Sequence, residues 1–161
     1  MSLSLVKSIT DVVARFRDEA HPSMQTMHGL AGDLAPRPID PSSIEQGCPV
    51  ARCLTFAESE NRDLWSGLWE CSAGKFKWVY SGDEIVQILE GEVVVREEGT
   101  GVVHTLHAGD AAYFPAGLVA HWEVPSFVKK FFVLRVPRKS DFVTRLRRAA
   151  RGVLLAGGPG L

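Results

Sequence analysis

The sequence contains little cysteine, no excess of charge of one sign and no long hydrophobic run, and each absence narrows the class of protein. Its 18 Lys and Arg nearly balance its 19 Asp and Glu, for a formal net charge of −1. Charge therefore does not favour nucleic acid or an anionic membrane as the main partner. No apolar run reaches the length of a membrane span, and no secretory signal is recognisable at the N-terminus. We expect a cytoplasmic protein that binds neither nucleic acid nor membrane.

The three cysteines are Cys48, Cys53 and Cys71. Their number is odd and they show no C-x-x-C spacing, which argues against a disulfide framework. Reduced thiols in a cytoplasm are the simplest interpretation.

A chain of 161 residues is long enough for one domain with a substantial core, and its texture divides it into three regions. Residues 1–50 hold a predicted helix at 4–20, where apolar residues recur at helical spacing, and then a proline-rich extended segment that we expect to wrap the surface. Residues 51–136 are rich in short β-prone runs. Residues 137–161 hold a predicted basic amphipathic helix followed by a glycine-rich tail.

The central region predicts strands, because short β-prone runs alternate with Gly, Pro, Asn and Asp turn signals. Nine such runs are predicted, at residues 52–56, 64–71, 76–80, 84–89, 92–96, 102–106, 111–114, 121–124 and 127–134. Even spacing of short strands is typical of an antiparallel sandwich or barrel. The expected fold class is all-β, a single antiparallel β-barrel or jelly roll with flanking N-terminal and C-terminal helices.

One carboxylate in this region lies in an unusual place. Side chains alternate between the two faces of a strand, so Glu84 shares a face with Val86 and Ile88. On the preceding predicted strand, Phe76, Trp78 and Tyr80 share a face in the same way. Because burial of an unpaired carboxylate is costly, Glu84 either turns to solvent or meets a partner or ligand in a cavity.

Two blocks of the central region resemble the two conserved motifs of the cupin superfamily. The first cupin block reads G-x5-H-x-H-x3,4-E-x6-G, and here Glu84 precedes Gly91 by the same six-residue gap. The second reads G-x5-P-x-G-x2-H; Gly109, Pro115 and Gly117 fit it, and His121 follows with one extra residue. The resemblance implies a cupin barrel.

Residues 40–136 also resemble, in more detail, the subfamily of the (S)-ureidoglycine aminohydrolase cupin domain. The shared elements are Trp69-Glu70, Gly74-Lys75-Phe76, Tyr80, Glu84, Leu89-Glu90-Gly91, Gly109-Asp110, Pro115-Ala116-Gly117, Trp122-Glu123-Val124 and Lys130. This resemblance implies a nitrogen-rich ureide substrate, although the histidines of that enzyme's metal site are absent here.

Most metal cupins bind a divalent ion with two His and one Glu from the first block and one His from the second. In this chain the first two ligand positions fall on Trp78 and Tyr80, which leaves Glu84 and His121. Imidazole and carboxylate suit Mn, Fe, Ni or Zn, but a lasting site normally needs three or four protein ligands. The predicted metal site is therefore incomplete unless Tyr80 or a substrate completes it.

Each candidate residue has a functional and a structural interpretation. Glu84, His121, Tyr80 and Lys130 are candidates for acid–base catalysis. Glu84 could instead be one half of a buried ion pair, and His121 could be bonded to water at the barrel mouth. Parity alone does not say which lysine on the last strand turns inward, and the resemblance favours Lys130 over Lys129. Three tryptophans are expected to line a ligand pocket or core; they are Trp69, Trp78 and Trp122.

Two hypotheses of different classes follow. In the first, the protein is an enzyme that binds a small polar metabolite in the barrel and acts on it by acid–base steps, with or without a metal, in hydrolysis, isomerisation or deamination. In the second, it is a small-molecule-binding or regulatory module without turnover, which the missing histidines favour. A third possibility is a homodimeric structural protein that uses the N-terminal segment and the basic helix as its interface. Cupin-like barrels often pair through sheet edges, which covers unpaired strand edges, so a homodimer is expected.

Overall fold

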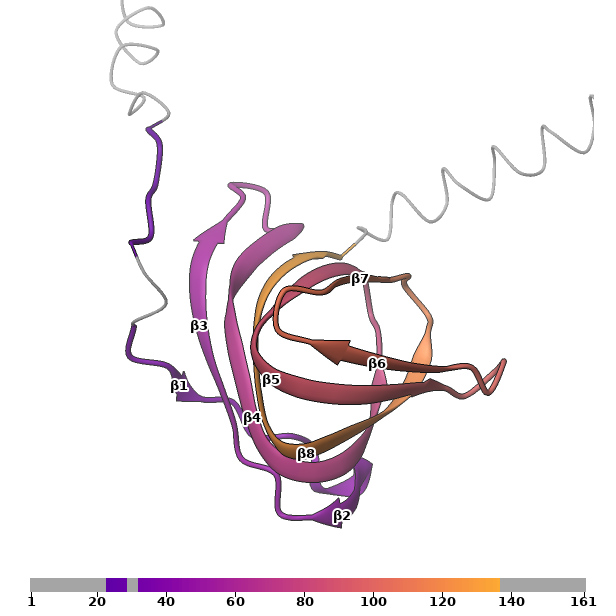
Figure 1. Cartoon of the computed structure of the whole chain (residues 1–161). Coiled ribbons are helices and arrows are strands. Elements are labelled where there is room, and N and C mark those ends of the chain that lie inside the picture. The colour runs from indigo at the N-terminus through magenta and orange to yellow at the C-terminus, as the bar shows by residue number, and fades with distance from the viewer. Residues whose placement is uncertain (1–22, 29–31, 137–161) are drawn as a thin grey trace, which may run out of the picture.

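The computed structural model describes residues 23–28 and 32–136 (Figure 1). In that part of the chain, every regular element is a β-strand apart from one short 3₁₀ turn, η1. The elements in chain order are β1 (Ala35–Pro36), η1 (Pro41–Ser43), β2 (Ile44–Gly47), β3 (Ala51–Glu58), β4 (Leu64–Val79), β5 (Asp83–Glu97), β6 (Val103–His107), β7 (Ala111–Phe114) and β8 (Val119–Arg135).

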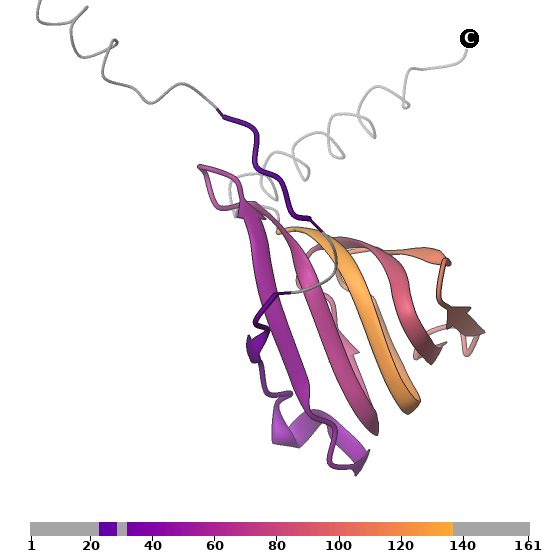
Figure 2. The same cartoon turned by 60° about the vertical axis from the view of Figure 1, so that its left-hand side comes forward.

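Three long strands form the middle of one antiparallel sheet. The order of hydrogen-bonded neighbours is β1-β3-β4-β8-β5-β6, with β2 added to β4 and β7 added to β5. The neighbours β3, β4, β8 and β5 lie side by side in Figure 2. The sheet curls round on itself in Figure 1, but this path of pairing does not return to its starting strand. The prediction of an all-β antiparallel fold is confirmed, whereas a barrel closed by hydrogen bonds is not found.

Each long strand bends in the middle, so that its two parts belong to different halves of the curled sheet. The first part of β4 pairs with β3, and its last part pairs with β2. In the same way β5 pairs first with β7 and then with β6, while β8 runs between β4 and β5 along both halves. Apolar side chains from the two halves therefore face each other, and the core lies between them.

The bends fall where the sequence analysis placed breaks between strands. The pairing of β4 with β8 shifts register between Ser72 and Gly74, and that of β5 with β8 shifts between Gly91 and Val94. A bulge and a tight turn both favour glycine, so the sequence signal is the same for the two. Gly91 has a φ of 74°, and a Cβ there would collide with the Phe127 carbonyl oxygen. As a result, six of the nine predicted runs merge into the three long strands.

The predicted sharing of faces is confirmed. Phe76 and Tyr80 on one side, and Val86 and Ile88 on the other, are all buried, and all belong to one apolar cluster. Burial of such side chains contributes roughly 1.5–3 kcal/mol each. Several residues of this apolar cluster also line the candidate site.

Other predictions fall partly or wholly outside the described residues. Within the proline-rich segment that was predicted to be extended, the structure contains η1 and β2. The helices expected at 4–20 and beyond 140 lie outside the residues that the structure describes. Within those residues, no helix has the length and apolar character needed to cross a membrane.

Candidate functional site

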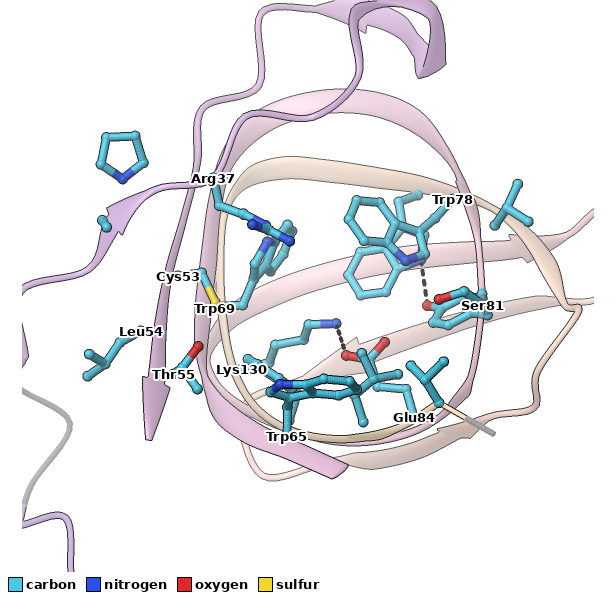
Figure 3. Close-up of a pocket in the computed structure, with 18 of the residues that line it drawn as sticks. Arg37, Cys53, Leu54, Thr55, Trp65, Trp69, Trp78, Ser81, Glu84 and Lys130 are labelled. Carbon is cyan, nitrogen blue, oxygen red and sulfur yellow. Dashed lines mark hydrogen bonds and ion pairs between the residues drawn. The ribbon is translucent and has the colours of Figure 1, made fainter. Parts of the chain in front are cut away.

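A cavity of about 800 Å³ opens on the concave side of the curled sheet, within the range of small-molecule sites. Figure 3 shows it with its lining side chains, which come from β1, β3, β4, β5 and β8. Most of them are aromatic or aliphatic. Two charged side chains, Glu84 and Lys130, are buried in it.

Glu84 and Lys130 form an ion pair inside this cavity. The Lys130 Nζ donates a hydrogen bond to Glu84 Oε1 at 2.9 Å, and only 7% and 9% of the two side chains, respectively, are exposed. Adjacent strands supply them, because Glu84 of β5 lies opposite Leu134 of β8 and Ile88 lies opposite Lys130. Figure 3 shows both side chains pointing toward each other in the cavity.

Strand alternation decides which lysine enters the cavity. Lys130 shares the buried face of β8 with Val128 and Phe132, while Lys129 lies on the other face, with its Nζ 4.0 Å from Glu70 Oε2. The prediction that Lys130 turns inward is therefore confirmed.

Two indole rings also stabilise the buried ammonium group. The Lys130 Nζ lies 4.8 Å from the ring centroid of Trp122 and 5.1 Å from that of Trp69. A cation over a tryptophan face gains about 0.5–2 kcal/mol, more when water is excluded. A carboxylate and two aromatic faces thus hold the Lys130 amine in one place.

The tryptophans form a cage around the pair. Trp69 lies edge-on to Trp78 and to Trp122, with ring centroids 6.3 Å and 5.9 Å apart. Trp65 also lines the cavity, so all 4 tryptophans of the chain lie there. The sequence analysis placed Trp69, Trp78 and Trp122 in a pocket or core and missed Trp65. Its signal was available, since Trp65 and Trp69 lie four residues apart and so share a face of β4.

Tyr80 is a buried hydrogen-bond donor beside the pair. Its ring stacks on Phe114, with centroids 4.6 Å apart, and its hydroxyl oxygen accepts from Trp122 Nε1 at 3.1 Å. Burial, with a smaller contribution from the Glu84 charge, raises the pKa of Tyr80 well above its usual range. Its hydroxyl therefore stays protonated, and no described residue accepts that proton in a hydrogen bond.

His121 does not join Glu84. It lies on the outer face of β8, where its Nδ1 is 2.6 Å from Glu45 Oε1 and its Nε2 is 3.9 Å from Glu98 Oε1. The next residue, Trp122, points into the cavity instead. The extra residue between Gly117 and His121 explains the difference, because a slip of one position moves a strand side chain to the opposite face. The expected opposition of Glu84 and His121 is therefore wrong.

The residues of the cavity do not fit a divalent transition metal. Glu84 is one carboxylate whose Oε1 is already bonded to Lys130, Trp78 has no donor atom for a metal, and His121 faces outward. Nowhere in the described chain do three or more His, Cys, Asp or Glu side chains come together in a group that could hold a metal ion. The predicted Mn, Fe, Ni or Zn site on Glu84 and His121 is not supported.

Arg37 and Cys53 also line the cavity (Figure 3), and the sequence analysis did not predict either as a site residue. They come together because β1 pairs with β3, with Ala35 opposite Cys53. Desolvation raises the pKa of Cys53, and the positive charges of Arg37 and Lys130 partly oppose that rise. No pattern in the sequence predicted that the two-residue strand β1 pairs with β3.

The domain is a curled antiparallel sheet around an aromatic cavity. A sequence model described as the EutQ-like cupin domain matches residues 58–132. This match supports the wider resemblance to cupins for that part of the chain. The finer assignment is corrected, because the matching family and relatives are of the EutQ type and do not specifically indicate ureidoglycine aminohydrolase.

Two curated relatives are both named acetate kinase EutQ. The protein from Salmonella typhimurium is 29% identical over 119 residues, covering 70% of this chain and 50% of that protein. The Escherichia coli protein is 28% identical over 119 residues, covering 70% and 49%. The chain thus spans about half the length of these relatives.

Solved structures share the fold. A protein of unknown function from Pseudomonas syringae pv. tomato is 25% identical, with a TM-score of 0.61 over 66% of this chain and 46% of that one. The EutQ protein of Clostridium difficile is 18% identical, with a TM-score of 0.51 over 62% of this chain and 75% of that one. At that identity the second likeness concerns the fold alone.

Proposed function

We propose that the cupin cavity binds a small polar metabolite with a flat or partly apolar body, that Glu84 and Lys130 act on it by proton transfer, and that Tyr80 donates a hydrogen bond to it. The observation that carries this proposal is the Glu84–Lys130 ion pair, because it is buried and lines the cavity. An apolar pair of similar volume would cost less to bury. Charges retained at such a place are typical of a functional site.

The donors and acceptors of the cavity suit acid–base chemistry. Glu84 is the proton acceptor within reach of a ligand, while Lys130 and Tyr80 are donors. Hydrolysis, isomerisation and deamination all need one group of each kind. Because His121 faces away from the cavity, Glu84 and Lys130 take the acid–base roles for which it was also a candidate.

A non-catalytic binding or regulatory module is the second candidate. It is favoured by the fact that Glu84 and Lys130 satisfy each other's charge within the protein. Such a pair can orient a bound metabolite without transferring a proton. Measurement of turnover separates the two candidates.

The activity named for the Salmonella and E. coli relatives belongs to proteins about twice as long as the matched part. Our proposal for this chain concerns the cavity only. A homodimer, a cytoplasmic location and the absence of nucleic-acid and membrane partners stay predictions.

A ligand screen read by tryptophan fluorescence tests the proposal, since all 4 tryptophans line the cavity. Compounds that bind are then assayed for turnover with wild type, Glu84→Gln and Glu90→Gln. Glu90 lies exposed on the same strand and makes no ion pair within the described chain. We expect Glu84→Gln to lose turnover and Glu90→Gln to keep it. Equal turnover in all three proteins would assign Glu84 a structural role.

A further inference from the structure

We propose that Lys130 attaches a small aldehyde or ketone covalently, as an imine formed inside the cavity. This inference rests on the proposed function, since it names the chemical class of ligand and the atom that it meets. The reacting atom is the Lys130 Nζ, which lines the cavity beside Glu84.

The position of the amine favours attack on a bound carbonyl group. Its side chain is 7% exposed, and the Glu84 hydrogen bond together with the rings of Trp69 and Trp122 fixes it in place. A carbonyl compound bound in the same cavity is held close to the amine, which favours their reaction.

Glu84 supplies the proton transfers that imine formation requires. The Lys130 ammonium gives one proton to the Glu84 carboxylate, and the neutral amine adds to the carbonyl carbon. A proton moves from nitrogen to oxygen, which gives a carbinolamine. Glu84 returns its proton to the hydroxyl group, water leaves, and the nitrogen lone pair forms the C=N bond. The balance is one ammonium plus one carbonyl compound giving one protonated imine plus one water, with no oxidant or reductant.

The same surroundings that stabilise the ammonium also stabilise the product. A protonated imine carries its positive charge at the former ammonium nitrogen. Glu84 Oε1 at 2.9 Å and the two indole faces at 4.8 Å and 5.1 Å surround that position.

The unused donors of the cavity favour a carbonyl oxygen as the group to be received. The hydroxyl of Tyr80 and the indole N–H groups of Trp65 and Trp78 have no acceptor among the described residues. These three groups are thus donors available to a ligand, beside the carboxylate acceptors Glu84 and Asp33. An aldehyde or ketone oxygen matches this arrangement, because it accepts hydrogen bonds and donates none.

Reductive trapping on the wild-type protein tests the inference. Benzaldehyde at limiting concentration is the probe, cyanoborohydride reduces any imine to a stable amine, and peptide mass spectrometry locates the product. We expect benzyl adducts on Lys130 to form at least about tenfold faster than on Lys129, a small part of what positioned reactants gain. Benzyl alcohol, which has the same flat body and cannot form an imine, should compete. Lys130→Arg, which keeps the charge, should lose the adduct and still bind benzyl alcohol.

The controls separate this inference from the function on which it rests. If benzyl alcohol changes the tryptophan fluorescence while adducts form only on exposed lysines, the cavity binds ligands and the imine proposal is overturned. If neither compound changes the fluorescence nor labels Lys130, the proposed cavity function fails as well. Slower trapping in Glu84→Gln than in Glu90→Gln would support the proton-transfer role of Glu84.

Discussion

Replacement of Lys130 by methionine tests the energetics of the buried pair. The substitution removes the partner of the Glu84 carboxylate, whose side chain is only 9% exposed. Loss of one partner from a buried pair costs roughly 3–5 kcal/mol, because the remaining charge is uncompensated. For a chain of 161 residues this corresponds to a fall in melting temperature of roughly 10 °C. Domains of this kind are stable by about 5–15 kcal/mol, so the loss is large.

The double variant Glu84→Gln/Lys130→Met shows where that loss comes from. Removal of both charges leaves no buried ion, so we expect its free energy of unfolding to return to within about 1 kcal/mol of wild type. Urea unfolding of the wild type, both single variants and the double variant gives the coupling energy directly. Because protonation of the orphaned carboxylate removes its charge, Lys130→Met should also recover stability as the pH falls.

Lys129→Met is the matched control on the opposite face of β8. Its partner Glu70 lies 4.0 Å away and keeps Arg52 at 3.6 Å, so we expect a clearly smaller loss of stability. The reasoning is refuted if the double variant is as unstable as the two single variants added together, or if Lys129→Met costs as much as Lys130→Met.

Four further predictions concern single residues. The raised pKa of Tyr80 means that its contribution to stability is complete below about pH 10, the ordinary tyrosine value, and is lost at higher pH; Tyr80→Phe should flatten this alkaline decline in urea unfolding. Burial raises the pKa of Cys71 to about 12, so a thiol reagent at pH 8 should label the exposed Cys48 quickly and Cys71 only after unfolding. His121→Ala should leave ligand binding unchanged in fluorescence titrations, because its ring lies outside the cavity; a loss of affinity would restore it to the site. Gly91→Ala should lower the melting temperature, since it adds a Cβ at a φ of 74° against a backbone carbonyl, at a cost of about 1–3 kcal/mol.

The sequence predicted the faces of the central strands well, because alternation is a local rule. Glu84 was expected among apolar neighbours and is buried beside Val86 and Ile88. The same rule gave two opposite faces for Lys129 and Lys130, and only the family resemblance chose between them. A buried ion pair was one of the alternatives for Glu84, and it is present because Glu84 and Lys130 both follow the period of their own strand.

Three features could not be predicted from local sequence. Gly74 and Gly91 lie at bulges in continuous strands. Because bulges and tight turns both favour glycine, the sequence could not distinguish a bulge from a turn. His121 matched a motif with one residue too many, and that single residue moved it to the outer face of β8. Arg37 was beyond prediction because a two-residue strand, β1, determines its place.

The most direct test of the central claim uses the indole N–H resonances in ¹⁵N NMR spectra. All 4 tryptophans line the cavity, so a compound bound there should shift these resonances in wild type and in Glu90→Gln. The account predicts that Glu84→Gln shows the same shifts only at higher ligand concentration. If the ligands that bind leave the indole resonances unmoved and shift those of exposed residues instead, the cavity around Glu84 and Lys130 is not the binding site.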